Sequence, residues 1–339
     1  MVVCLLFGGQ SSEYEVSLAS ACSVLRAIDR KKYIIYKIGI TKDGGWLLFD
    51  GADEEIFEDK WHKNKKNKPI CVDISGKCFK TPAEEIIPDV IFPIMHGEYG
   101  EDGRVQALCE LMGVRCVGIP SDSAVICMDK EISKTIAMRE LVPVVPYVSV
   151  RAGYDIDKIC AEIGESVQDV FVKPSKGGSS VGISRTHTKN ELAAAIERAL
   201  KYSDTVLIEE AIHGIECEVA ILEYGTRRVV SEVGSLSYKS DFYDYDTKYH
   251  SEDVKYKIPA KIPENSADLC RKYAKILFSA LKCRGMSRVD FFVTDAGEVY
   301  FNEINASPGF TAGSMYPMLM AHMGYEMRTL IDILIDSAK

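Results

Sequence analysis

The chain has 339 residues, of which 47% are hydrophobic and 27% are charged, and its formal net charge is −9. This length and composition are ordinary for a globular protein of two or three domains with a sizeable core. The negative balance argues against sequence-independent binding to nucleic acid, which needs a basic surface. An anionic substrate such as a nucleotide would therefore need positive charge supplied locally, by selected lysines or by metal ions.

The 11 cysteines are dispersed as single residues, without a CxxC pair or a His/Cys cluster at zinc spacing. This pattern is typical of reduced thiols in a cytoplasmic enzyme, most of them small core residues. The N-terminal stretch MVVCLLFGG lacks the basic region of a signal peptide, and no apolar run approaches the ~20 residues that span a bilayer. We expect a cytoplasmic protein that binds neither a membrane nor nucleic acid.

Residues 1–120 alternate strand and helix patterns and form the first predicted unit. The run GGQSSEYEVSLASACSVLRAI predicts a helix directly after a buried strand, and the basic run DKWHKNKKNK (59–68) is interpreted as a solvated loop. Strand, glycines and helix in this order predict a parallel, doubly wound sheet whose ligand edge lies at the strand C-termini. The remaining predicted elements of this unit are strands at 2–7, 33–40 and 88–95 and a helix at 104–112.

Two further units are predicted, at 121–206 and 207–339. In the first we expect a helix in MDKEISKTIAMREL, an extended linker at 142–150, a strand–glycine loop–strand segment in VQDVFVKPSKGGSSVGIS and a helix in KNELAAAIERAL. In the second we expect several strands, the aromatic and acidic stretch SDFYDYDTKYH, and a helix near 266–281.

The last predicted element is a hairpin in RVDFFVTDAGEVYFNEIN, with its turn at Ala296-Gly297. This turn would place Asp290 opposite Glu303, with Asn305 further along the same face. Two like charges facing each other across strands are destabilising unless a cation lies between them. Because all three side chains offer oxygen ligands, the set suits Mg²⁺ and disfavours zinc. We interpret the pair as a site for Mg²⁺–ATP.

The glycine loop in FVKPSKGGSSVGIS is similar to a phosphate cradle, because small residues let backbone N–H groups approach an anion. It is not a Walker A loop, since no GK[ST] follows the glycines, and a Gly/Ser hairpin without any ligand would explain it equally well. Lys130 and Lys173 can each place a positive charge on nucleotide phosphates. The segment VLIEEAIHGIECEV offers Glu209, Glu210 and Glu216 for an adenine amine and ribose hydroxyls.

Seven segments together resemble the ATP-grasp superfamily and, within it, the D-alanine–D-alanine ligases. They are FGGQSSEYEVS, HGEYGEDGRVQ, MDK, VKPSKGGSSVG, DFYDYDTKY, SRVDFF and NEINASPGFT. The resemblance implies an α/β and α+β fold, in which a doubly wound N-terminal domain precedes two ATP-grasp units that clamp ATP. It also implies ligation of two D-alanines through a D-alanyl phosphate for peptidoglycan synthesis, Mg²⁺ (or Mn²⁺) with two ions per site, and a homodimer.

The resemblance assigns catalytic roles to five residues. Glu13 matches the glutamate that binds the ammonium of the first D-alanine, although from the sequence it could equally complete a helix-capping pattern after Ser11 or Ser12. With Ser179 and Tyr249 it matches a hydrogen-bonded triad that closes a loop over the site. The two residues that match the stabilisation of the transferred phosphate and the oxyanion are Arg288 and Gly309.

Other matches concern binding. Three residues match positions beside the amino-acid substrates: His96, Ser314 and Met315. Nine residues match or suit the nucleotide site: Lys130, Lys173, Gly178, Ser180, Glu209, Glu210, Glu216, Tyr243 and Lys248.

The second substrate is left open between D-alanine and D-serine. Tyr249 favours an amine nucleophile, because lactate-using relatives carry histidine there. The stretch SMYP (314–317) favours D-alanine, whereas FGGQSSEYEVSLASA, GITKDGGW and SRVDFF also resemble the D-serine ligases of vancomycin resistance. A nucleotide-binding protein without turnover is disfavoured, because such a protein need not keep a full catalytic set.

Overall fold

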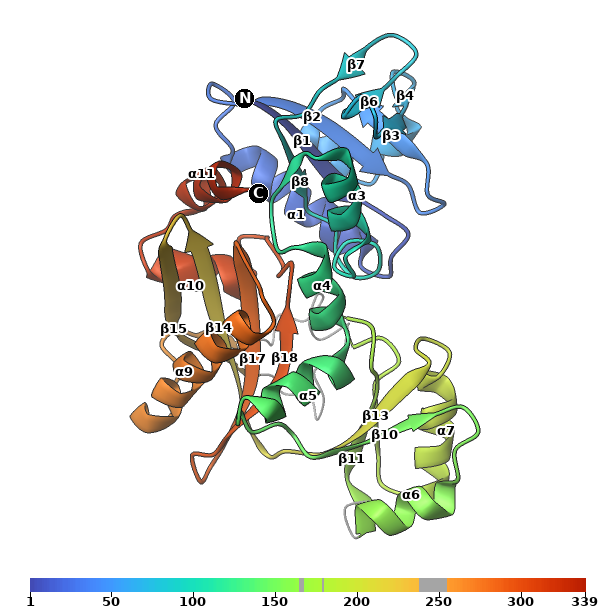
Figure 1. Ribbon diagram of the computed structural model, residues 1–339, viewed down its shortest axis with the longest axis vertical. Helices are drawn as coiled ribbons and strands as arrows, with labels where there is room; N and C mark the ends of the chain where they lie inside the picture. The colour runs from blue at the N-terminus through green and yellow to red at the C-terminus, as the bar shows by residue number, and fades with distance from the viewer. Residues whose placement is uncertain (165–167, 179, 238–254) are drawn as a thin grey trace.

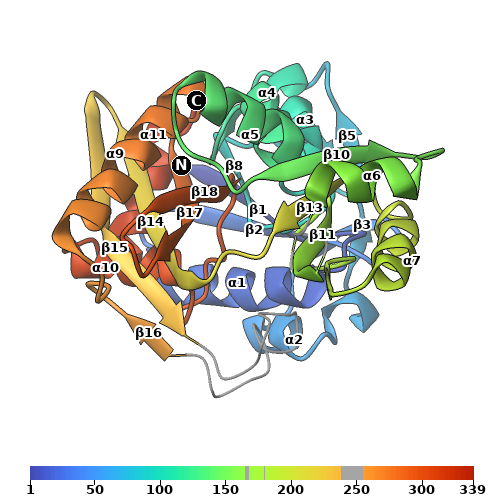
Figure 2. The same ribbon diagram turned by 90° about the horizontal axis from the view of Figure 1, so that it is seen from below.

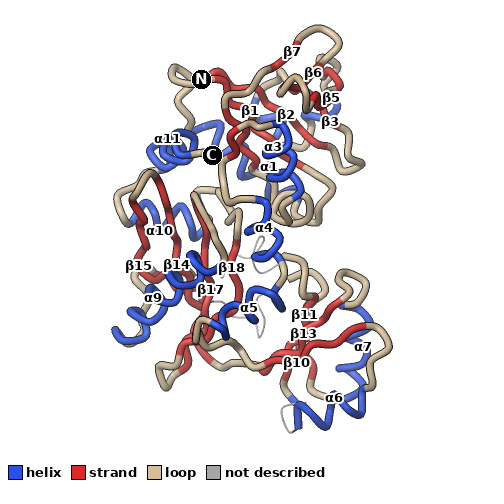
Figure 3. The backbone as a smooth tube through the Cα atoms, in the orientation of Figure 1, coloured by secondary structure: helices blue, strands red, loops and turns tan. Residues whose placement is uncertain are grey.

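The computed structural model describes residues 1–164, 168–178, 180–237 and 255–339 (Figure 1). The chain folds around three main sheets, which Figure 3 shows as separate groups of strands. Within the described part, no helix is long and apolar enough to cross a lipid bilayer.

The N-terminal sheet has six strands in the order β4-β3-β2-β1-β8-β9. Its centre is parallel, which confirms the predicted doubly wound sheet. The strands are β1 (Val2–Gly8), β2 (Ile34–Ile40), β3 (Trp46–Phe49), β4 (Lys68–Pro69), β8 (Val90–Pro93) and β9 (Arg115–Cys116). The accompanying helices are α1 (Tyr14–Ala27), α2 (Asp53–Phe57) and α3 (Arg104–Met112). A small sheet that the sequence did not predict comprises β5 (Cys71–Asp73), β6 (Cys78–Lys80) and β7 (Glu85–Ile86).

The basic run 59–68 is anchored by a tryptophan. Trp61, in the short 3-10 helix η1 (Trp61–Lys63), is fully buried, and its ring centroid lies 4.9 Å from that of Phe7 and 6.2 Å from that of Phe49. Its Nε1 donates a hydrogen bond of 3.0 Å to the hydroxyl of Tyr14. The interpretation of the whole run as a solvated loop is therefore wrong for Trp61. The exposed lysines of the run are Lys60, Lys63, Lys65 and Lys66.

The second sheet is antiparallel, with four strands in the order β10-β13-β11-β12. Its strands are β10 (Tyr147–Arg151), β11 (Val170–Pro174), β12 (Ser184–Thr186) and β13 (Thr205–Glu210), and its helices are α6 (Ile156–Ile163) and α7 (Lys189–Ala199). The predicted strand–glycine loop–strand segment is confirmed by the pairing of β11 with β12. The expected linker at 142–150 is only partly correct, because its second half forms the edge strand β10.

The third sheet is antiparallel, with five strands in the order β16-β15-β14-β17-β18. Its strands are β14 (Gly214–Tyr224), β15 (Arg227–Ser237), β16 (Lys255–Lys257), β17 (Met286–Thr294) and β18 (Val299–Asn305). One face packs on α4 (Ser121–Met128), α5 (Lys130–Arg139) and α9 (Glu264–Ala280). The opposite face packs on α10 (Met315–His322), as Figure 2 shows from below.

The C-terminal helix α11 (Met327–Ser337) joins the third sheet to the N-terminal unit. It packs against α1, and one continuous apolar core includes side chains of β1, α1, β14, α10 and α11. The backbone N–H of Cys116 also donates to the carbonyl of Lys339 at 2.9 Å. The N-terminal sheet and the five-stranded sheet therefore share a core, whereas the four-stranded sheet has a separate one.

We expect Trp61→Ala to lower the free energy of unfolding by about 3–5 kcal/mol, because it opens a large cavity and removes the partner of Tyr14. Chemical denaturation measures this change. Lys65→Ala, at an exposed position of the same run, is the control and should change the free energy of unfolding by less than about 0.5 kcal/mol. An equally small loss for Trp61→Ala would contradict the anchoring role.

Candidate active site

Two neighbouring cavities lie where the three sheets meet. The first, of about 540 Å³, is lined by ends of the N-terminal unit and by the turn after β18. The second, of about 260 Å³, lies between the four-stranded and the five-stranded sheets. Both are bordered by the same described residues: Lys130, Gly177, Gly178, Glu218, Arg288 and Glu303.

The β17–β18 hairpin places Asp290 directly opposite Glu303, as the sequence predicted. The predicted turn is wrong by one residue, because the loop contains three residues, Asp295 to Gly297, and Gly297 has a positive φ of 84°. The pairing is nevertheless correct because β18 contains one extra residue, Asn302, between the residues opposite Phe291 and Asp290. This β-bulge offsets the longer turn.

The bulge also changes which side chains face the cavity. Side chains of a regular strand alternate between its two faces. In β18, Phe301 and Ile304 lie in the core, whereas the two consecutive residues between them, Asn302 and Glu303, both line the second cavity. The extra residue, Asn302, therefore adds a polar side chain beside Glu303, and the carboxylate of Glu303 still faces the cavity.

Arg288 lies at the centre of the wall that the two cavities share. Its Nε and Nη2 donate to the carboxylate of Asp290 at 2.8 and 2.7 Å, and its Nε also lies 3.1 Å from Oε2 of Glu218. Asn305 Nδ2 donates to the same Asp290 at 2.9 Å. Burial opposes the charge of Arg288, but the two carboxylates outweigh it and raise the pKa of the guanidinium. The guanidinium is thus held charged and in a fixed orientation.

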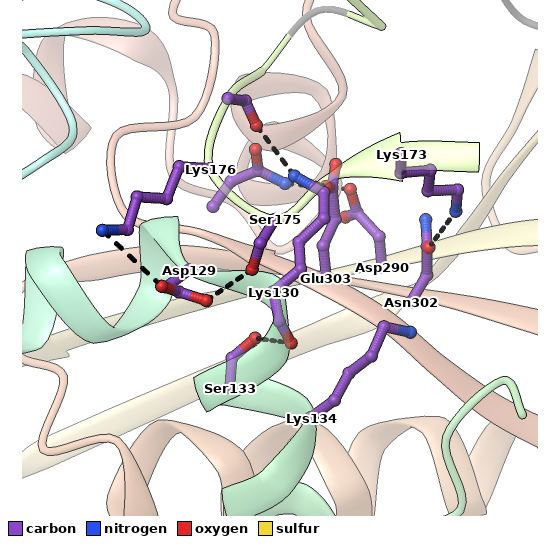
Figure 4. Close-up of polar contacts among 12 residues, drawn as sticks. Asp129, Lys130, Ser133, Lys134, Lys173, Ser175, Lys176, Asp290, Asn302 and Glu303 are labelled. Atoms are coloured by element: carbon purple, nitrogen blue, oxygen red, sulfur yellow. Dashed lines mark hydrogen bonds and ion pairs between the residues drawn. The ribbon is translucent and has the colours of Figure 1, made fainter. Parts of the chain in front are cut away.

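The lysines that the sequence assigned to phosphates both line the second cavity, and Figure 4 shows their contacts. Lys130, at the beginning of α5, donates to the carbonyl of Gly177 at 2.8 Å, and its Nζ lies 3.2 Å from Oε2 of Glu303. Lys173, on β11, donates to Glu209 at 2.6 Å and to Asn302 at 3.3 Å. Both ammonium groups are therefore brought to the second cavity, next to the glycine loop.

The glycine loop is fixed to α5 by Asp129. Its Oδ1 accepts hydrogen bonds from the backbone N–H groups of Glu131 and Ile132 and from the hydroxyl of Ser175 at 2.6 Å (Figure 4). The N–H of Lys130 donates to the carbonyl of Ser175 at 2.9 Å. One carboxylate thus caps the helix and holds the start of the loop.

Glu209 has surroundings that the sequence did not predict. Its buried carboxylate lies between Lys173 and the fully buried Lys134, whose Nζ is 3.1 Å from Oε1. Burial alone would raise the pKa of Glu209, but the two lysines lower it. Lys134 lies one helical turn after Lys130, and this spacing on one helix face was the signal that could have identified it. Glu210, Glu216 and Ser180 line the second cavity.

Glu13 lies against two glycines that are distant in the sequence. A Cβ atom added to Gly178 would come within 2.8 Å of its Oε2, and one added to Gly97 within 2.6 Å. Either added atom would displace the carboxylate of Glu13, and Gly97 also has a positive φ of 67°, which favours glycine. At the beginning of α1, no cap hydrogen bond from the Glu13 side chain is found among the described residues, whereas the hydroxyl of Ser11 accepts a hydrogen bond of 3.1 Å from the backbone N–H of Glu13. The structure thus brings Glu13, in the first cavity, to the glycine loop.

His96 lines the first cavity but binds protein groups through both ring nitrogens. Its Nε2 lies 3.0 Å from the hydroxyl of Ser20, and its Nδ1 lies 3.2 Å from Glu101 and from the carbonyl of Ser307. Burial raises the pKa of Glu101, and the nearby charge of Glu13 adds to this effect. His96 therefore connects the N-terminal unit to the turn after β18.

That turn brings the other predicted substrate residues together. Gly309, Ser314 and Met315 all line the first cavity. The hydroxyl of Ser314 accepts from the N–H of Thr311 at 3.1 Å, and a Cβ atom added to Gly309 would lie 2.9 Å from it. Met315 is buried against Gly234 of β15, where an added Cβ atom would come within 2.7 Å of its sulfur.

Four predicted site residues lie outside the described residues: Ser179, Tyr243, Lys248 and Tyr249. Their roles stay predictions.

The carboxylates of the hairpin fit a hard cation. Asp290, Glu303 and Asn305 offer oxygen atoms on one face of β17 and β18. The hairpin supplies only two carboxylates, and across the described ranges no group of three or more His, Cys, Asp or Glu side chains forms a complete protein cage for a metal ion. This arrangement suits Mg²⁺, which typically takes one or two carboxylates and completes its octahedron with water and substrate phosphates.

Comparison with known proteins gives the same family over the whole chain. The family model for the D-ala D-ala ligase N-terminus matches residues 2–119, and that for the C-terminus matches residues 137–336. The D-alanine–D-alanine ligase of Clostridium acetobutylicum is 41% identical over 99% of this chain and 97% of its own length. The enzyme of the same name from Acetivibrio thermocellus is 42% identical over 99% and 95%.

Two solved structures have the same fold. The VanG D-Ala:D-Ser ligase from Enterococcus faecalis superposes with a TM-score of 0.89 and 36% identity, over 99% of this chain and 98% of its own. The D-alanine–D-alanine ligase from Coxiella burnetii gives a TM-score of 0.89 and 30% identity, over 99% and 93%. The chain therefore belongs to the D-alanine–D-alanine ligase family and has its ATP-grasp fold.

Proposed function

We propose that this chain is an ATP-dependent ligase that joins two D-alanines into D-alanyl-D-alanine and releases ADP and phosphate. The observation that carries this proposal is the wall shared by the two cavities, which contains Lys130, Arg288 and Glu303. An amino-acid carboxylate in the first cavity can meet nucleotide phosphates in the second at this wall. The curated relatives that share about two fifths of its sequence carry the same activity in their names.

The first D-alanine would bind with its ammonium at Glu13 and its carboxylate toward Arg288. Lys130 and Lys173 would hold the phosphates of ATP, with Glu210 and Glu216 available for the nucleoside. The substrate carboxylate takes the γ-phosphoryl group, and the resulting acyl phosphate is attacked by the amine of the second D-alanine. Positioning of the reactants contributes much of such a rate, since it replaces random encounters by a fixed geometry.

Arg288 would stabilise the negative charge that develops on the transferred phosphate and on the tetrahedral oxyanion. Its fork is already oriented by Asp290 and Glu218, so little reorganisation is needed during the reaction. The backbone N–H of Gly309 would add a second donor. Closure over the site by Ser179 and Tyr249, with Lys248 at the phosphate, would exclude the water that hydrolyses an acyl phosphate.

Asp290, Glu303 and Asn305 would hold Mg²⁺ (or Mn²⁺), two ions per site, which neutralises phosphate charge when bound. The carboxylates are now paired with Arg288 and Lys130. The same carboxylate oxygens would serve both the metal ion and these two side-chain cations, so Arg288 and Lys130 would stay beside the phosphates.

D-Serine is the second candidate for the attacking substrate. The structural similarity to the VanG D-Ala:D-Ser ligase favours it. The buried thioether of Met315 favours the methyl group of D-alanine, but an apolar pocket rejects an added hydroxyl by only about 10²-fold. We place D-alanine first, because the named ligases at 41–42% identity use it. A cytoplasmic role in peptidoglycan synthesis and a homodimer stay predictions from the family resemblance.

Product analysis by mass spectrometry tests the proposal directly. The protein receives Mg²⁺–ATP and D-alanine, with and without equimolar D-serine, and with D-lactate in a separate reaction. We expect D-alanyl-D-alanine to dominate, with ATP consumed in proportion. Dominant D-alanyl-D-serine would identify D-serine as the second substrate, and the absence of any dipeptide would refute the proposal.

We expect Arg288→Lys to lower the rate of ligation by about 10²-fold or more, because a lysine cannot reproduce the fork held by Asp290. ATP affinity, measured by calorimetry, should change little. Arg284→Lys, at an exposed position just before β17, is the control. Turnover of Arg288→Lys near the wild-type rate would remove Arg288 from the oxyanion role.

We expect Glu303→Gln to raise the Mg²⁺ concentration needed for half-maximal ATP binding by about tenfold, because a carboxylate ligand is replaced by a neutral amide. Calorimetric titration measures this without turnover. Glu298→Gln, exposed on the same hairpin, should leave the titration unchanged. If both variants behave alike, Glu303 is not a metal ligand.

A further inference from the structure

The positive charge of the Lys173 ammonium is largely cancelled by a neighbouring carboxylate. It lies 2.6 Å from the carboxylate of Glu209, and both groups line the second cavity. A lysine paired so closely with a carboxylate presents little net charge to a phosphate, because the two charges cancel at a distance. Lys173 alone with Glu209 would therefore be a poor anchor for a nucleotide phosphate.

The buried Lys134 supplies a second positive charge that neutralises Glu209. It has no exposed surface, is absent from the described lining of both cavities, and its Nζ lies 3.1 Å from the second oxygen of Glu209. It also donates to the carbonyl of Phe301 at 3.4 Å. Two ammonium groups around one carboxylate leave one net positive charge, and Lys173 is the cation on the cavity side.

Asn302 completes the arrangement from the other side. Its Oδ1 accepts a hydrogen bond of 3.3 Å from Lys173, and the β-bulge turns it toward the cavity. Lys173 has three donor hydrogens, of which Glu209 and Asn302 accept two in the described part of the chain. The third is available for a phosphate oxygen. A neutral amide here orients the ammonium without cancelling its charge.

We propose that Lys134 is a positioning residue that acts through Glu209. It compensates the charge of Glu209, so that Lys173, oriented by Asn302, carries the positive charge for the nucleotide phosphates. The inference rests on the proposed function for the identity of the ligand as a nucleotide. It concerns a residue that does not touch that ligand and that the sequence analysis did not identify.

The test measures binding of ADP by calorimetry in the absence of divalent cations, with adenosine as a ligand that lacks phosphate. We expect Lys134→Met to weaken ADP binding by about tenfold, because the remaining charges of Lys173 and Glu209 then sum to zero. Adenosine affinity should be unchanged. In Lys134→Met/Glu209→Gln the lost cation and the lost anion balance, so ADP affinity should return to within about threefold of wild type.

The double variant separates this role from a merely structural one. If Lys134 only supported packing, the second substitution would add to the damage. An ADP affinity for the double variant equal to or below that of Lys134→Met would therefore overturn the proposal, as would wild-type affinity in folded Lys134→Met.

If Lys134→Met does not fold, Asn302→Asp gives an independent test. This nearly isosteric change adds a negative charge beside Lys173, and we expect it to weaken ADP binding as Lys134→Met does. Asn302→Ser, which adds no charge, is the matched control and should have a smaller effect. Equal affinities for the two variants would refute the charge argument. Wild-type protein that binds ADP but forms no dipeptide would refute the proposed function and leave this inference intact.

Discussion

Buried side chains of opposite charge neutralise one another and fix the residues that line the two cavities. Arg288 is enclosed by Asp290 and Glu218, and Glu209 by Lys134 and Lys173. A buried charge that loses its partner costs several kcal/mol, so each group fixes the position of its neighbours. The Arg288 contacts lie within the five-stranded sheet, whereas Lys134 of α5, a helix that packs on that sheet, contacts Glu209 of the four-stranded sheet. The geometry of the site and the packing of the four-stranded sheet against α5 therefore depend on the same contact.

The substrate and nucleotide halves of the site are supported in different ways. Glu13 and His96 belong to the N-terminal unit, which shares an apolar core with the face of the five-stranded sheet that packs on α10. Their distance from Arg288 is therefore set by side-chain packing. The four-stranded sheet has its own core, and its glycine loop is held largely by polar contacts to Asp129 and Lys130. Polar contacts of this kind can be exchanged for contacts to a ligand.

The sequence predicted what depends on local pattern. The hydrophobic runs of β1, β2 and β8 and the helical pattern of α5 and α7 needed no distant information. The proximity of Glu13 to Gly178 could not be deduced from such patterns, because it depends on how two sheets pack. The motif resemblance implied it only indirectly, through the triad of Glu13 with Ser179, the residue that follows Gly178. Trp61 was misjudged because its neighbours are lysines, and a single buried anchor has no periodicity.

The hairpin shows how a local error can leave a functional inference intact. A shift of one residue in pairing would turn every side chain of β18 to the opposite face. The three-residue loop introduces such a shift, and the bulge at Asn302 reverses it before Glu303 is reached. The longer loop and the bulge therefore offset each other, and Asp290 stays opposite Glu303. The residue that makes the correction also becomes a partner of Lys173, so one insertion in the strand serves both the carboxylate pair and the phosphate lysine.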